Sequence, residues 1–212
     1  MIDRSVDEKN LHRLSALSDG IFAIAMTLLV LDIRVTPDLD PAGFRQMLHD
    51  LLPKIASYAL SFTILAGFWR DHRRILRLAQ WMDTVTVWLT LAGLGVIALL
   101  PFPTTMLSEY ASQPLAVVVY ACTVIVIDVL QLAVFFSIRR HPEMARPVPP
   151  HFNRNFVMDL GSTILVFGVT VPIAFFSPTA ALWTWLALVP LKFVLGRHER
   201  SRAGQDAEQD TR

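Results

Sequence analysis

The first apolar segment of the chain combines charged, hydroxyl and branched aliphatic side chains at helical spacing. It begins with Arg13, carries Asp19 about a turn and a half further on, and holds one threonine, Thr27, among aliphatic residues. Ionisable groups inside a membrane-spanning helix are costly and are candidates for functional sites by default. The segment is therefore a candidate site, and its plain alternative is a lipid-facing anchor helix.

Helical geometry sorts this segment into two faces. As a helix, residues 11–33 extend about 35 Å, which exceeds the thickness of a bilayer core of about 30 Å. At about 100° per residue, one face of this helix forms a mainly aliphatic stripe, and Asp19 falls on the opposite face. The two faces therefore meet different surroundings. If Asp19 turns towards neighbouring helices, the stripe turns towards lipid or towards its own copies about a symmetry axis. The residues of the stripe are Arg13, Leu17, Gly20, Ile24, Thr27, Leu28 and Leu31.

Composition indicates an integral membrane protein. Hydrophobic residues make up 53% of the chain, charged residues only 17%, and the mean hydropathy is +0.46, which a soluble domain of this size does not need. The single cysteine excludes a disulfide within one chain. No zinc-protease helix motif, nucleophile elbow, phosphate-binding glycine loop or paired-cysteine motif is present. We therefore expect neither an enzyme nor a cofactor, and no bound metal centre.

Six apolar segments predict an all-α, polytopic membrane protein with six transmembrane helices. The second and the last segments are short. We expect one six-helix transmembrane domain over 1–200 and a charged, disordered tail over 201–212. The segments are about 11–33, 53–69, 81–104, 114–138, 153–176 and 179–196.

Basic residues predict the orientation of these helices. In this arrangement one side of the membrane receives 16 of the 19 lysines and arginines, and the positive-inside rule makes that side cytoplasmic. Both termini are then cytoplasmic. The arginines end helices at a membrane surface, so we expect no nucleic-acid binding. Trp183 and Trp185 are expected at the opposite interface, at the start of the sixth helix.

Three further aspartates lie within the predicted helices. Asp83 and Asp159 lie within about two turns of a helix start, where the helix dipole favours a carboxylate, so a structural role is expected. Asp128 is deeper and has Gln131 one turn away. It is either a proton-sensitive site or a buried partner of an arginine or hydroxyl.

Two motifs resemble a known family. The run Arg13-x-x-x-Leu17-Ser18-Asp19-Gly20, with Phe-Ala-Ile-Ala shortly after, resembles the signature of the endosomal/lysosomal potassium channels called transmembrane protein 175 and their bacterial homologues. Leu17 stands where phenylalanine is usual. Ser61-Phe-x-x-Leu-x-x-Phe68-Trp69-x-x-His72 resembles the second helix of that family.

The resemblance implies a potassium-permeable, leak-type channel in the cell (inner) membrane, without a glycine-rich carbonyl filter. Bacterial members are homotetramers whose first helices line the pore. Ile24, Thr27 and Leu31 would form the constriction, with Leu17, Gly20 and Leu28 also facing the pore, potassium passing near Thr27 and modest selectivity for potassium over sodium. The resemblance also implies an inter-helix polar network of Arg13, Ser18, Asp19, Trp69 and His72.

Two other functions remain open. A proton-coupled or proton-permeable secondary transporter is the main alternative, because transporters place ionisable groups and broken helices near the midplane. Asp128 and Pro172 are the features of this chain that fit it. The other alternative is a non-conducting structural membrane protein.

Overall fold

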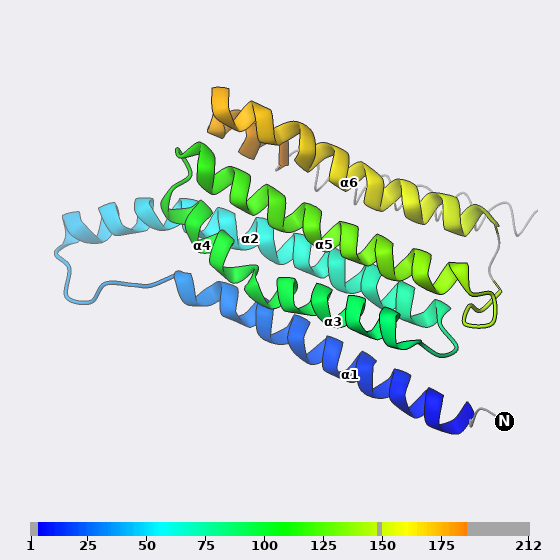
Figure 1. The fold of residues 1–212 in the computed structure, drawn as a ribbon. Coiled ribbons are helices and arrows are strands. Elements are labelled where there is room, and N and C mark those ends of the chain that lie inside the picture. The colour runs from blue at the N-terminus through cyan, green and yellow to red at the C-terminus, as the bar shows by residue number, and fades with distance from the viewer. Residues whose placement is uncertain (1–3, 148–149, 186–212) are drawn as a thin grey trace, which may run out of the picture.

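The computed structural model describes residues 4–147 and 150–185, and these form a bundle of long helices (Figure 1). Among them no strand occurs, apart from one isolated antiparallel bridge between Ala79 and Ala145. Residues 178–185 are also helical. The elements in chain order are α1 (Arg4–Leu28), the 3-10 turn η1 (Leu29–Asp32), α2 (Pro41–Leu78), α3 (Thr84–Leu99), α4 (Pro101–Glu109), α5 (Pro114–Arg140) and α6 (Pro150–Phe176).

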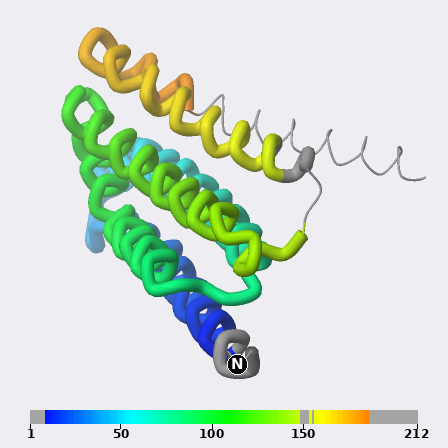
Figure 2. Tube along the Cα trace, turned by 45° about the vertical axis from the view of Figure 1, so that its right-hand side comes forward, coloured from blue at the N-terminus to red at the C-terminus, as the bar shows by residue number. Residues whose placement is uncertain are grey.

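The helices are arranged so that α1 lies at one side of the bundle. Helix α5 contacts α6 on one side and α3 on the other, and α1 packs against α2 and α3. Figures 1 and 2 both show α1 and α6 on opposite sides of the bundle. One face of α1 is consequently not covered by the part of the chain that the structure describes.

One end of the bundle collects most of the basic side chains, and we call it the basic end. It holds the start of α1, the α2–α3 connection and the α5–α6 connection (Figure 1). The two connections are joined, since Gln80 N donates to the Met144 carbonyl (2.8 Å) and Arg146 N donates to the Leu78 carbonyl (2.7 Å). This grouping matches the charge distribution that the positive-inside argument used.

The prediction of an all-α polytopic membrane protein is confirmed. Five helical stretches of the described residues are long and apolar enough to cross a bilayer: Lys9–Asp32, Pro41–Leu78, Thr84–Glu109, Pro114–Arg140 and Phe156–Phe176. The sixth predicted segment, 179–196, lies for the most part outside the described residues, as does the predicted tail 201–212.

The prediction of a short second segment was wrong. Helix α2 has 38 residues and its first turns project beyond the other helices (light blue in Figure 1). The helix begins at Pro41, with Asp40 as N-cap, whose Oδ1 accepts from Gly43 N at 2.7 Å. Pro53 removes one backbone hydrogen bond inside the helix, but it does not end it.

Two other predicted segments are not single, uninterrupted helices. The predicted segment 81–104 is divided between α3 and α4, because Leu100 ends one helix and Pro101 opens the next. Likewise α1 ends at Leu28, and Leu29–Asp32 continues as a 3-10 turn. Proline in the first turn of a helix costs no hydrogen bond, because a backbone N–H at that position would have no partner within the helix. Pro101 can therefore open α4 without losing a hydrogen bond.

Trp185 is a core residue rather than an interface residue, so its predicted position was wrong. Its side chain is fully buried. The ring stacks on Phe167 with centroids 4.9 Å apart, and Nε1 donates to Thr170 Oγ1 at 2.9 Å. Trp183 is 67% exposed, which fits an interface position. Helical spacing places the two rings on different faces, and neighbouring helices bury only one of them.

Asp83 has the structural role that was predicted for it. It is the N-cap of α3, and its Oδ1 accepts from Thr86 N at 2.9 Å. Hydrogen bonds from Thr86 hold the pKa of the Asp83 carboxyl below its usual range. The cap therefore stabilises the fold above the ordinary carboxyl pKa, and this contribution is lost as the pH falls through the lowered pKa.

We expect Asp83→Ala to lower the free energy of unfolding by about 1 kcal/mol at neutral pH, as for other N-cap deletions. Thermal unfolding of the detergent-solubilised protein at neutral and strongly acidic pH tests this. The gap between variant and parent should close in acid, and an equal gap at both pH values would contradict the charged-cap account.

Candidate pore lining and its supporting polar network

One face of α1 and η1 presents large apolar side chains outward. The exposed fractions are 48% for Leu17, 59% for Ile24, 41% for Leu28 and 61% for Leu31. Gly20 and Thr27 on the same face are also exposed. These are the apolar residues, glycine and threonine of the stripe predicted from the sequence, whose remaining member, Arg13, is also exposed. Leu31 stays on this face although it belongs to the 3-10 turn. We call this set the α1 stripe: Leu17, Gly20, Ile24, Thr27, Leu28 and Leu31.

The opposite face of α1 is the one that packs into the bundle. Phe22, Ala25 and Leu29 are at most 2% exposed and belong to the main hydrophobic core. Burial of this face fixes the rotation of α1 within the chain. The α1 stripe therefore meets something other than this subunit's core.

The Thr27 hydroxyl has a defined orientation. Its Oγ1 donates to the carbonyl of Ile24 at 2.8 Å, so its only hydrogen is directed back along the helix. A hydroxyl oxygen has two acceptor lone pairs in addition to its hydrogen. Since the side chain is exposed, these lone pairs are available to a cation beside the α1 stripe.

Asp19 lies between the two faces and is held by helix α2. Trp69 Nε1 donates to Asp19 Oδ1 at 2.7 Å, a charge-assisted bond of the stronger class. The Arg73 guanidinium lies 4.8 Å from the centroid of the same indole ring, within cation–π range. Arg73, Trp69 and Asp19 thus form a continuous chain from the basic end to α1.

A second contact joins α1 to α2 one residue away. Ser18 is 1% and His72 5% exposed, and His72 Nε2 lies 3.0 Å from Ser18 Oγ. The Ser18 hydroxyl donates to the Leu14 carbonyl at 2.8 Å. Because a hydroxyl has only one hydrogen, His72 Nε2 must carry the proton and donate to Ser18.

The structure brings together four of the five residues predicted for the polar network. Ser18, Asp19, Trp69 and His72 are in direct contact across α1 and α2. Arg13 is exposed and makes no hydrogen bond or ion pair with the described residues. Arg13 lies at the same end of the bundle as the four contacting residues, but it is not part of their network.

A carboxylate that the sequence analysis did not single out is also buried at this end. Asp71 is 8% exposed and forms ion pairs with Arg70 (3.2 Å) and Arg74 (3.1 Å). Arg70 also reaches Asp159 of α6 at 3.8 Å. Asp71 stands in a run of basic residues, which is typical of a solvated turn. Its burial follows only from tertiary packing, since α5 packs against both α2 and α6.

Asp128 is 2% exposed and lies in the core of α5. Gln131, one turn on, donates to the Phe68 carbonyl of α2 at 3.4 Å. Asp128 therefore belongs to the core of the subunit and not to the outward face of α1.

Comparison with known proteins identifies the family. Residues 13–101 match the family model described as endosomal/lysosomal potassium channel TMEM175. A potassium channel of Streptomyces collinus is 32% identical over 177 residues, which cover 80% of this chain and 85% of that protein. The chain belongs to the TMEM175 family. TMEM175 proteins are ion channels and not enzymes.

A solved TMEM175 structure supports the same assignment. The crystal structure of a lysosomal potassium-selective channel TMEM175 homologue from Chamaesiphon minutus is 25% identical, with a TM-score of 0.73 over 88% of this chain and 97% of that one. The chicken protein described as endosomal/lysosomal proton channel TMEM175 is 27% identical over 188 residues, 84% of this chain but 37% of the chicken protein.

Proposed function

We propose that this chain is the subunit of a potassium-permeable, leak-type channel whose constriction is the α1 stripe. The observation that carries the proposal is the outward exposure of Ile24, Thr27 and Leu31 on a helix whose other face is buried in its own subunit. The names of the bacterial relatives support the choice of potassium.

The assembly that suits this geometry is a homotetramer in the cell (inner) membrane. Helix α1 lies at the side of the bundle, so four copies can bring their stripes to a common axis without moving other helices. The basic end faces the cytoplasm in this proposal, following the positive-inside rule. The Trp69–Asp19 and His72–Ser18 contacts then hold α1 from behind, with Arg13 at the cytoplasmic entrance.

Conduction through such a pore depends on dehydration. Rings of Ile24 and Leu31 form dry collars that gate by dewetting, as other hydrophobic constrictions do. Between them, four Thr27 oxygens offer acceptor lone pairs in place of lost water, as the orientation of Oγ1 allows. Potassium loses its hydration shell more readily than sodium, so the expected selectivity is modest.

We expect Thr27→Ala to lower the selectivity for potassium over sodium severalfold, because it removes the only side-chain oxygens between the Ile24 and Leu31 rings. Reversal potentials under bi-ionic conditions in planar bilayers measure this directly. Thr163→Ala on α6 is the matched control and should leave the reversal potential unchanged. An unshifted reversal potential in Thr27→Ala would remove this residue from the selectivity role.

Proton permeation is the second candidate function. The vertebrate relatives described as proton channels favour it. Reversal potentials across a pH gradient at symmetric potassium separate the cases. A reversal potential near zero supports a potassium pathway, and one that follows the proton gradient supports proton flux.

A further inference from the structure

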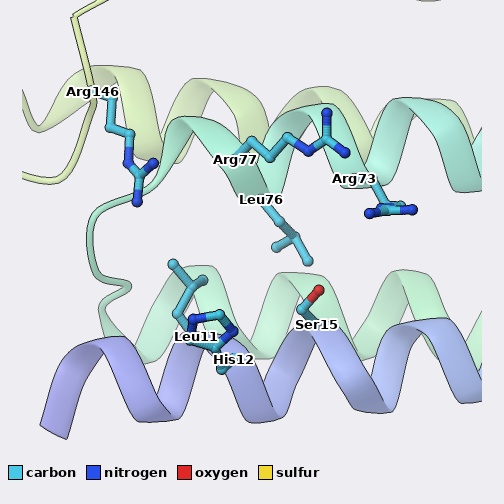
Figure 3. Close-up of a pocket in the computed structure, with 7 residues that line it drawn as sticks. All are labelled: Leu11, His12, Ser15, Arg73, Leu76, Arg77 and Arg146. Carbon is cyan, nitrogen blue, oxygen red and sulfur yellow. The ribbon is translucent and has the colours of Figure 1, made fainter. Parts of the chain in front are cut away.

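A cavity at the basic end lies between α1 and α2 and is not part of the α1 stripe. Its volume is about 340 Å³, near the lower end of the range for small-ligand pockets. Figure 3 shows three arginine side chains around one side of it and the first turns of α1 along the other. The lining residues are Leu11, His12, Ser15, Arg73, Leu76, Arg77 and Arg146.

The charge of this cavity is not neutralised by the described part of the chain. Among the side chains that the structure describes, its lining includes three guanidinium groups and no carboxylate. The neighbouring acids, Asp71 and Asp159, form their ion pairs with Arg70 and Arg74 instead. Arg73 rests on the Trp69 ring, which leaves its fork of N–H donors available.

The position of Arg146 shows that distant segments meet at this cavity. Arg146 comes from the α5–α6 connection, far away in sequence, and its backbone N donates to the Leu78 carbonyl at the end of α2. The bridge between Ala79 and Ala145 fixes the same segment. The backbone thus places Arg146 at one end of the cavity, with the Arg77 and Arg73 side chains further along the same side, as Figure 3 shows.

The chemistry of the lining selects a phosphate group. Arginine forks bind phosphate oxygens with paired, charge-assisted hydrogen bonds, and Ser15 and His12 add further donors. The cavity lies in the first turns of the Lys9–Asp32 span and the last turns of the Pro41–Leu78 span, which is the depth of lipid headgroups. Leu11 and Leu76 give it an apolar side. We propose that this cavity binds the phosphate of an anionic phospholipid headgroup.

A headgroup at this site would clamp α1 to α2. It would bridge Ser15 of α1 and Arg73 of α2, and Arg73 already contacts the Trp69 ring that holds Asp19. Binding itself does not depend on the proposed pore. An effect on current would rest on the proposed function, so the test measures binding alone.

The test counts lipids retained by the purified full-length protein in native mass spectrometry. The probes are phosphatidylglycerol and phosphatidylcholine with identical acyl chains. We expect the wild-type protein to prefer phosphatidylglycerol, and Arg77→Gln/Arg146→Gln to lower its retention about twenty-five-fold, since each arginine near a membrane surface contributes about fivefold to anionic-lipid binding. Both side chains are exposed, so the fold should survive.

The controls separate this site from general surface charge and from free phosphate. Arg140→Gln/Arg154→Gln removes the same charge from exposed positions outside the cavity and should retain lipid as the wild type does. Arg77→Lys/Arg146→Lys keeps the charge and should give an intermediate loss. Equal loss in the control double variant, or no loss in the cavity variant, would overturn the proposal. Inorganic phosphate is the second probe. If it stabilises the protein as well as phosphatidylglycerol does, and through the same arginines, the proposal that the bound phosphate belongs to a lipid would be overturned.

Discussion

Replacing Ile24 with asparagine is expected to raise the cation current about tenfold and to weaken selectivity. In the proposed homotetramer, four branched aliphatic side chains at one level would exclude water while the pore is narrow. Asparagine wets that level, and a barrier lowered by about 1.4 kcal/mol corresponds to a tenfold faster passage. The side chain is 59% exposed within the subunit, so the substitution leaves the subunit core intact. Macroscopic current per reconstituted channel is the measurement.

The matched control is Leu165→Asn on α6. Leu165 is 67% exposed and, like Ile24, lies near the middle of its candidate span. If both residues face lipid, the two variants should lose yield alike and neither should gain current. A gain confined to Ile24→Asn supports the pore, whereas similar behaviour of the pair would place the α1 stripe against lipid.

Trp69→Phe is expected to cause the largest loss of assembled protein. It keeps an aromatic ring but removes the Nε1 donor, which leaves the Asp19 carboxylate without its 2.7 Å partner. Loss of one partner of a part-buried carboxylate costs about 1–3 kcal/mol, and the weaker phenyl ring also holds Arg73 less well. The yield of folded tetramer and its unfolding temperature measure the effect. Asp19→Asn should give a similar but smaller loss, because its amide oxygen still accepts from Trp69.

The exposed residue Trp183 supplies the control for this experiment. Trp183→Phe changes the same atoms at a side chain that is 67% exposed and should leave assembly unchanged. The Trp69→Phe tetramers that do form should keep the wild-type selectivity, because Asp19 is not part of the α1 stripe. A stable Trp69→Phe tetramer with altered selectivity would place Asp19 in the pore itself.

Helical spacing alone separates Asp19 from Ile24, Thr27 and Leu31, but it leaves open which of the two faces turns towards the bundle. The structure buries the expected side and exposes the expected stripe. Residue chemistry requires only that a carboxylate in a membrane segment has a donor, and it was the family resemblance that placed Trp69 in one network with Asp19. Arg13 was predicted to belong to the polar network but lies outside it, because its charge alone does not reveal on which of two neighbouring faces of α1 the side chain lies.

The errors have two causes, which are a local helix start that was overlooked and packing between separate helices. Pro53 resembles a helix start, but Asp40 and Pro41 open α2 three turns earlier and the helix continues through it. Trp185 has the composition of an interface residue, but Phe167 and Thr170 of α6 surround it. The Arg70–Asp159 pair and the cavity beside Arg146 join segments more than 60 residues apart. Such proximity arises only from tertiary packing, which no local pattern encodes.

The most direct test of the central claim is an experimental map of the assembled protein in a lipid nanodisc. The account predicts four subunits whose Ile24, Thr27 and Leu31 side chains meet around a central axis, with Asp19 behind them against Trp69. A map in which Ile24 and Leu31 contact acyl chains, or in which Asp19 projects into the conduit, would contradict it.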